Sequence, residues 1–156
     1  RCFEHEDGLL LGRSWLMDPG AVERRTGERR RRRSLEELRS IADERGAGKL
    51  HDAAVEAFSA VTHYTRTTVT TVSFRVRRVE GGTRGVISVY PGDSSADAGL
   101  YVDIRLDEIA KHMRGPEEQA QEALPEPSGR ARYGDVYFFK SEDEIKRFAS
   151  ALRSDE

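Results

Sequence analysis

Two aspartates in the middle of the chain have a spacing that could hold a divalent metal. Asp93 follows a predicted strand, and Asp103-Ile104-Arg105 occupies the next one. Nucleases that use Mg²⁺ need an acidic residue and then an acid-x-lysine on the following strand, where the acids bind the ion and position water. Here the lysine position holds Arg105, which stays protonated at all working pH values. The pattern therefore favours ordinary outward-facing strand residues, and a metal-dependent nuclease remains the third hypothesis.

Two further stretches carry residues that could bind an ion or a polar ligand. The loop Pro91–Gly99 contains two aspartates and two serines, but it lacks the central glycine and terminal glutamate of a calcium loop. Its serines have no nearby histidine and no G-x-S-x-G frame. Cys2 and His5 have the spacing of half a zinc site, and no second pair follows. The sequence therefore predicts no catalytic residue, no metal and no cofactor.

An arginine-rich tract precedes the first predicted helix. Residues 23–33 hold seven arginines and two glutamates, a local charge of +5, with no apolar residue. Such a tract can neutralise phosphates along a nucleic acid, or it can be a solvated linker. It has no interleaved aromatic residues that would stack on bases. The candidate contacts in it are Arg29, Arg30, Arg31, Arg32 and Arg33.

Residues 67–106 alternate between apolar and polar side chains and predict an antiparallel meander. Strands are expected over 67–79, 84–90 and 100–106, with a glycine turn at 80–83. Leu100, Val102, Ile104 and Leu106 are expected to face inward. The outward face would then carry Arg75, Arg77, Arg105 and Tyr101.

That outward face is the second candidate surface. Arginine and tyrosine on an open sheet can hold phosphates and stack bases. The same residue types anchor protein interfaces. A solvated face with weak ion pairs is the third interpretation. The partner would be DNA or RNA, an upstream domain or another protein.

Helical patterns surround the meander. Ser34 and Glu37 form a capping box that opens a helix, and a second helix is expected over 50–61. His51 and His63 flank this second helix and are interpreted as surface or capping residues. Asp107 is expected to cap a short helix, and Pro116 to begin another.

The C-terminal part predicts one more strand and one more helix. Residues 125–132 are interpreted as a polar loop with two prolines, and 133–140 as an aromatic fourth strand. Ser141 and Glu144 form a second capping box, which opens the last helix. The N-terminal 22 residues fit neither helix nor strand cleanly, although Leu9–Leu11 suits a short strand.

Composition limits the class of protein. The chain has 156 residues, a hydrophobic share of 37%, a charged share of 35% and a net charge of −2, which excludes a uniformly basic protein. One cysteine and no apolar run of about 18 residues favour a cytoplasmic protein without membrane contact. The chain starts at Arg1, so an upstream region is expected to be missing.

These patterns predict one α+β domain over 34–156, with an antiparallel sheet of about four strands and helices packed on one face. Residues 1–33 are expected to form an Arg-rich arm or linker.

The stretch 48–152 resembles small uncharacterised bacterial domains that stand alone or end restriction- and defence-type proteins. The similar parts are the helix before the meander, the T-T-V-S-F-R-V strand and the closing G-D-V-Y-F-F-K-S-E-D-E-I-K-R-F. The resemblance implies an accessory module without enzymatic activity. Combined with the basic surfaces, it predicts nucleic-acid contact, with a protein-interaction or dimerisation domain as the alternative.

Overall fold

The computed structural model describes residues 2–5, 8–11, 14–17, 31–91, 99–113, 117–131 and 134–153. For the first three ranges and for 130–131 it describes the backbone alone. The chain divides into two units, Arg1–Arg32 and Arg33–Glu156.

The N-terminal unit contains a three-stranded antiparallel sheet. Its strands are β1 (Cys2–His5), β2 (Gly8–Leu11) and β3 (Ser14–Met17), in the order β1-β2-β3. The sequence predicted only a short strand at Leu9–Leu11, which corresponds to β2. Strands β1 and β3 were not predicted. Four-residue strands are too short for an alternating pattern to stand out.

The C-terminal unit contains the other elements. Its helices are α2 (Leu35–Glu44), α3 (Gly48–Val61), α4 (Leu106–His112), α5 (Glu117–Glu122) and α6 (Glu142–Leu152). Its strands are β4 (Tyr64–Thr67), β5 (Val72–Arg77), β6 (Thr83–Val89), β7 (Leu100–Ile104), β8 (Pro127–Ala131) and β9 (Gly134–Phe139). Within the described ranges, no helix is both long and apolar enough to cross a bilayer.

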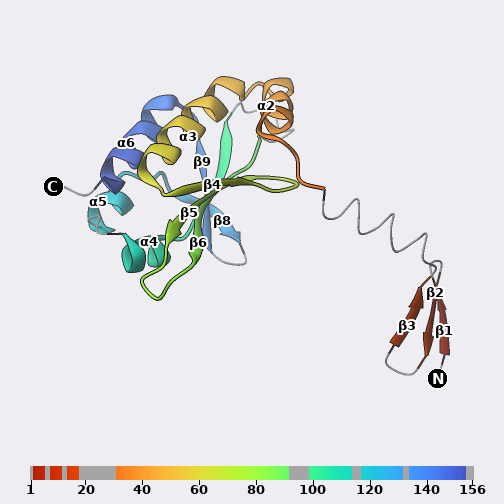
Figure 1. Cartoon of the computed structure of the whole chain (residues 1–156). Helices are drawn as coiled ribbons and strands as arrows, with labels where there is room; N and C mark the ends of the chain where they lie inside the picture. The colour runs from red at the N-terminus through yellow and green to blue at the C-terminus, as the bar shows by residue number, and fades with distance from the viewer. Residues whose placement is uncertain are drawn as a thin grey trace. The chain divides into compact units, whose positions relative to one another are not determined.

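The six strands form one antiparallel sheet in the order β4-β5-β6-β7-β9-β8. Figure 1 shows α3 and α6 above the strands of this sheet. The first four strands follow one another along the chain, and the last three of them, β5, β6 and β7, correspond to the predicted meander. The chain then passes through α4 and α5 to the far edge, forms β8, and returns as β9 between β8 and β7. The α+β class with an antiparallel sheet is therefore confirmed, whereas the expected number of about four strands is wrong, because the sheet has six.

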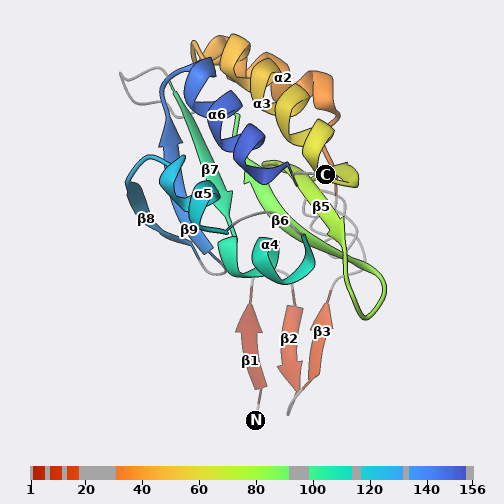
Figure 2. The ribbon, with the colours of Figure 1, turned by 90° about the vertical axis from the view of Figure 1, so that its left-hand side faces the viewer.

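Helices α3 and α6 lie against one face of this sheet, in front of the strands in Figure 2. Four phenylalanine rings join the two layers. Phe58 of α3 contacts Phe74 of β5 at a centroid distance of 5.6 Å and Phe148 of α6 at 6.0 Å. Phe148 in turn lies 6.3 Å from Phe139 of β9. All four rings are fully buried, so this aromatic chain forms the middle of the core.

The sequence missed β4 because a threonine-rich turn was interpreted as strand. Residues 67–79 contain many threonines, which are common in strands. In the structure, the backbone N–H groups of Thr70 and Thr71 donate to the Thr68 hydroxyl at 3.3 and 3.0 Å. This side chain closes a turn after β4, and β5 begins only at Val72.

The sequence also missed β8, which was expected to be a polar loop. The strand begins at Pro127 and occupies the outer edge of the sheet. Proline lacks an N–H donor and is tolerated at the start of an edge strand, where no partner is needed on one side. The two prolines of residues 125–132 therefore did not indicate a loop, because one of them begins an edge strand.

A β-bulge interrupts the pairing of β5 with β6. Phe74 pairs with Ile87, but the next pair is Arg75 with Gly85, which leaves Val86 as the extra residue. Beyond the bulge, Arg84 lies opposite the buried Val76, and its Nη2 contacts Glu108 Oε1 of α4 at 3.2 Å. The bulge thus turns Arg84 toward the helices and leaves Gly85 on the other face.

Several local predictions are confirmed. The capping box of Ser34 and Glu37 is present, and Gly81 and Gly82 have positive φ values of 106° and 75° in the predicted hairpin turn. Two predictions are wrong. Helix α4 begins at Leu106 after Arg105, not after Asp107, since strand β7 ends at Ile104. His51 is 1% exposed, because it shares the inner face of α3 with Ala54 and Phe58.

Replacing Phe58 tests the aromatic chain. Phe58→Ala removes both ring contacts and leaves a cavity between the layers, so we expect a loss of about 3–5 kcal/mol in the free energy of unfolding. Val79→Ala is the control, because Val79 is 79% exposed. Urea unfolding followed by circular dichroism measures both variants. A loss below about 1 kcal/mol for Phe58→Ala would show that the rings do not hold the layers together.

Candidate nucleic-acid interface

The face of the sheet opposite α3 and α6 carries the predicted basic residues. In β5, Val72, Phe74 and Val76 are buried against the helices, so Arg75 and Arg77 point to the open face. In β7 the same alternation places Tyr101 and Asp103 there. Arg105 follows β7, and its charge acts on both Arg75 and Asp103. The structure therefore brings Arg75, Arg105 and Tyr101 to one surface.

The Arg75 side chain is held in a defined position. Its Nε donates to the Thr83 hydroxyl at 3.0 Å, and its Nη2 to the Thr83 carbonyl oxygen at 3.4 Å. The guanidinium passes over Gly85, where an added Cβ would lie 3.3 Å from Nη1. Both hydrogen-bond acceptors are neutral, so the charge of Arg75 is oriented without being compensated.

Arginine charges concentrate around this side chain. Burial lowers the pKa of Arg75, and the charges of Arg66, Arg105 and Arg84 lower it further. Among the described residues, neither Arg66 nor Arg75 forms an ion pair. An anion bound here would relieve the mutual repulsion of these guanidinium groups. We call Arg66, Arg75 and Arg105 the basic cluster.

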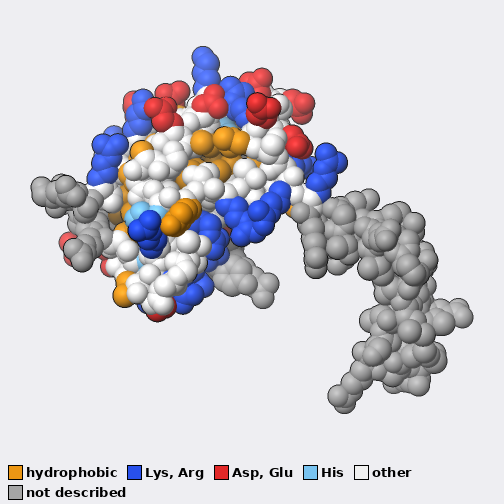
Figure 3. Space-filling view, in the orientation of Figure 1, with side chains coloured by type: hydrophobic (Ala, Val, Ile, Leu, Met, Phe, Trp, Pro, Cys, Tyr) orange, Lys and Arg blue, Asp and Glu red, His pale blue; other side chains and the backbone are white. Residues whose placement is uncertain are grey.

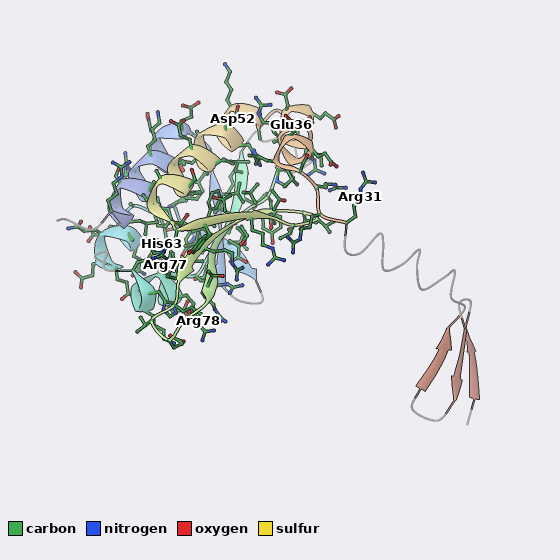
Figure 4. All side chains as sticks on the ribbon, in the orientation of Figure 1. Arg31, Glu36, Asp52, His63, Arg77 and Arg78 are labelled. Atoms are coloured by element: carbon green, nitrogen blue, oxygen red, sulfur yellow. The ribbon has the colours of Figure 1, made fainter. Side chains whose placement is uncertain are left out.

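Arg77 contacts residues near the β4 edge of the sheet. Its guanidinium carbon lies 5.8 Å from the centre of the Tyr64 ring, and its Nε donates to the Tyr64 hydroxyl at 3.2 Å. Its backbone N–H donates to His63 Nδ1 at 2.9 Å. Figure 4 shows His63 and Arg77 close together. Arg77 thus lies on the predicted face but is not among the charges that act on Arg75.

The other end of the open face is aromatic. Tyr101 of β7 and Phe138 of β9 have their ring centres 4.8 Å apart, and both side chains are half-buried. The Phe138 ring lies against Gly99, so any side chain at that position would displace it. Tyr90 follows β6 beside them, where its backbone N–H donates to the Tyr101 carbonyl oxygen at 3.0 Å. Arg105 lies four residues after Tyr101 along the chain, a span of about 13 Å in extended backbone.

Asp103 lies between the two ends. One of its oxygens, Oδ1, is buried and has no hydrogen-bond partner. Burial raises the pKa of this carboxyl; the charge of Arg105 opposes the shift, and that of Asp135 adds to it. A carboxylate at this position weakens the attraction of the face for anions.

The structure describes only part of the arginine tract. Arg29 and Arg30 lie outside the described residues, and Arg31 and Arg32 are exposed. Arg33 donates its backbone N–H to the Thr68 carbonyl oxygen at 3.2 Å and its Nη1 to the Val69 carbonyl oxygen at 3.1 Å. Arg33 therefore fixes the end of the tract to the turn between β4 and β5.

Most residues of the possible metal sites lie outside the part of the chain that the structure describes. Asp93 and most of the loop 91–99 are not among the described residues, and neither are the side chains of Cys2 and His5. Among the residues that are described, no group of three or more His, Cys, Asp or Glu side chains is placed to hold a metal ion.

Surface charge is unevenly distributed on the C-terminal unit. In Figure 3, acidic side chains over α2 and α3 are mixed with some arginine and lysine side chains, whereas the charged side chains lower down, along the strands, are mainly arginine and lysine. The net charge of −2 does not reflect this uneven distribution. No protein-family model, curated protein or solved structure matches this chain.

Sequence reasoning missed three residues of this surface: Arg66, Tyr90 and Phe138. Arg66 was missed because its strand β4 was not recognised. Tyr90 and Phe138 could have been predicted from the strand alternation. Tyr90 follows the buried Val89, and Phe138 precedes the buried Phe139. The aromatic fourth strand was noted, but its register against β7 could not be deduced.

Asp103→Asn tests the electrostatics of the open face. A raised carboxyl pKa means that the folded state holds the proton more tightly than the unfolded state, so ionised Asp103 costs stability at neutral pH. We expect Asp103→Asn to unfold at higher urea concentration than the natural chain at pH 7. This gain should shrink as the pH falls through the raised pKa.

Urea midpoints at pH 7 and about pH 3.5 measure the effect, with Asp107→Asn on the exposed first turn of α4 as the control. A less stable Asp103→Asn variant at pH 7 would show that attraction to Arg105 outweighs the burial cost.

Proposed function

We propose that this chain is an accessory module without chemistry of its own, which binds single-stranded nucleic acid on the open face of its sheet. The observation that carries the proposal is the basic cluster: Arg75 is fixed by neutral oxygens while Arg66 and Arg105 add their charges to it. The guanidinium groups of Arg66 and Arg75 form no ion pair among the described residues and suit phosphate oxygens, which they can contact through paired hydrogen bonds.

The aromatic end of the face supports a nucleic acid rather than a simple anion. Tyr101 and Phe138 are partly exposed and lie about four strand residues from the basic end. A single strand of nucleic acid lying along β7 could place its phosphates on the arginines and one of its bases on the Tyr101 ring. Stacking of this kind accepts any base, so binding would show little sequence preference.

A single strand suits the surface better than a duplex. Bases of a duplex are stacked on one another and cannot reach a ring on a sheet. The arginine tract would extend the contact by adding charge, because Arg33 ties it to the turn between β4 and β5.

A protein partner on the same face, or a dimer through the sheet edge, is the alternative. The edge strand β4 has only four residues and carries the exposed Arg66 and Tyr64. Short, charged edge strands resist pairing with a second chain. The sequence and length of β4 therefore disfavour a dimer that forms through this edge of the sheet.

Salt dependence of binding tests the basic cluster. We expect the full chain to bind a labelled mixed-sequence single strand at 50 mM salt and to bind a duplex of the same length more weakly. The logarithm of the association constant should fall linearly with that of the salt concentration. Arg75→Ala and Arg105→Ala should each reduce the slope by about 0.7, and replacing Arg29 to Arg33 with glutamine should reduce it further.

Fluorescence anisotropy measures these slopes. Arg147→Ala is the matched control, since Arg147 is an exposed arginine of α6 on the helical side. No binding at 50 mM salt, or equal slopes for Arg75→Ala and Arg147→Ala, would contradict the proposal. Concentration-dependent dimerisation without nucleic-acid binding would favour the alternative.

Stacking is tested at Tyr101. Tyr101→Ala removes the ring, and we expect a loss of about 1–3 kcal/mol of binding free energy with an unchanged salt slope. Tyr101→Phe keeps the ring and should keep the affinity within about 0.5 kcal/mol. Equal losses for both variants would show that the hydroxyl, not the ring, contacts the ligand. Circular dichroism checks that both variants are folded.

A further inference from the structure

A groove between α2 and α3 lies on the helical side of the C-terminal unit, on the opposite layer from the open face. Its volume is about 310 Å³, near the lower limit for sites that bind small organic molecules. Residues of both helices line it: Leu35, Glu36, Arg39, His51, Asp52, Val55 and Glu56. Figure 4 shows Glu36 and Asp52 on these neighbouring helices.

His51 is the unusual residue of this groove. It is 1% exposed, and neither of its ring nitrogens has a hydrogen-bond partner. Burial lowers the pKa of His51; the charge of Asp52 opposes this shift, and that of Arg39 adds to it. The neutral imidazole therefore offers one donor and one acceptor, both unsatisfied. An apolar side chain of similar size would fill the position without this cost.

The walls and the rim of the groove have different chemistry. Leu35 is 42% exposed and, with Val55, gives the groove an apolar wall on each helix. In Figure 3, apolar side chains are visible among the acidic side chains over these helices. The exposed apolar area is small, which suits a single flat group better than a second protein.

The rim is acidic. Arg39 is already occupied, because its Nε lies 2.7 Å from Asp52 Oδ1 and its Nη1 lies 3.3 Å from Asp43 Oδ1. Glu36 and Glu56 have no cationic partner among the described residues. With neutral His51, the lining residues carry three carboxylates against one guanidinium, which favours a cation.

We propose that this groove binds a small arylalkylamine: an aromatic ring with a hydroxyl at one end and an ammonium group at the other. The ring lies between Leu35 and Val55, the hydroxyl bonds to His51, and the ammonium group contacts Glu36 and Glu56. The ring, the hydroxyl and the ammonium group thus each contact one feature of the groove: its apolar walls, its unpartnered imidazole and its unpaired carboxylates.

Three probes of nearly equal shape separate these contacts. Tyramine has all three groups, phenethylamine lacks the hydroxyl, and 3-(4-hydroxyphenyl)propionate replaces the ammonium with a carboxylate. Titration calorimetry with the full chain should show tyramine binding about three- to tenfold more tightly than phenethylamine, the value of one neutral hydrogen bond. The propionate should bind roughly tenfold more weakly still, or not at all.

Variants assign the contacts to residues. His51→Leu should raise the melting temperature in the absence of ligand, because it removes two unsatisfied buried nitrogens. It should also reduce tyramine affinity to that of phenethylamine and leave phenethylamine unchanged. Glu36→Gln should weaken both amines alike, and Glu44→Gln, at the other end of α2, is its control.

Three results would overturn the proposal. One is the absence of tyramine binding at millimolar concentration, and another is equal binding of tyramine and the propionate. The third is a His51→Leu variant that folds but binds tyramine and phenethylamine as the natural chain does. If His51→Leu does not fold, the probe series and Glu36→Gln still decide the outcome.

Discussion

The packing of Phe58 and Phe148 between the helices and the sheet determines which surfaces this protein can offer. The two rings bridge Phe74 on β5 and Phe139 on β9, so α3 and α6 are held over the centre of one sheet face. A sheet of six strands buried on both faces would need helices on both sides. Here all of the described helices that cover the sheet lie on one side (Figure 2), and none of them covers the other face.

Charge follows this two-layer arrangement. Acidic residues open α2 and α6, where they suit the positive ends of the helices, and the helical side becomes acidic. The open face instead receives arginines at the alternate positions of its strands. Carboxylates therefore outnumber cationic side chains in the groove between α2 and α3, and arginines gather at one end of the open face, although the charge of the whole chain is nearly balanced. The two proposed sites lie on the two layers, and either could fail without affecting the other.

Strong alternation made the central strands predictable, because a strand with one buried face repeats every two residues. The faces of Arg75 and Tyr101 followed directly from it. The edge strands lacked that signal: β4 has four residues and precedes a threonine turn, and β8 begins with a proline. Arg66 was lost with β4. The burial of His51 could have been found, since it lies three and seven residues before Ala54 and Phe58 on one helical face. Its unsatisfied nitrogens depend on tertiary packing, which no local pattern encodes.

The central claim is that a single-stranded nucleic acid lies on the open face and not elsewhere on the C-terminal unit. The most direct test is an NMR titration of the ¹⁵N-labelled full chain with a short single strand, following the arginine Nε–H signals. The account predicts that the signals of Arg66 and Arg75 shift progressively, while those of Arg39 and Arg147, on the helical layer, stay in place. Shifts confined to Arg39 and Arg147, or none at saturating oligonucleotide, would contradict it.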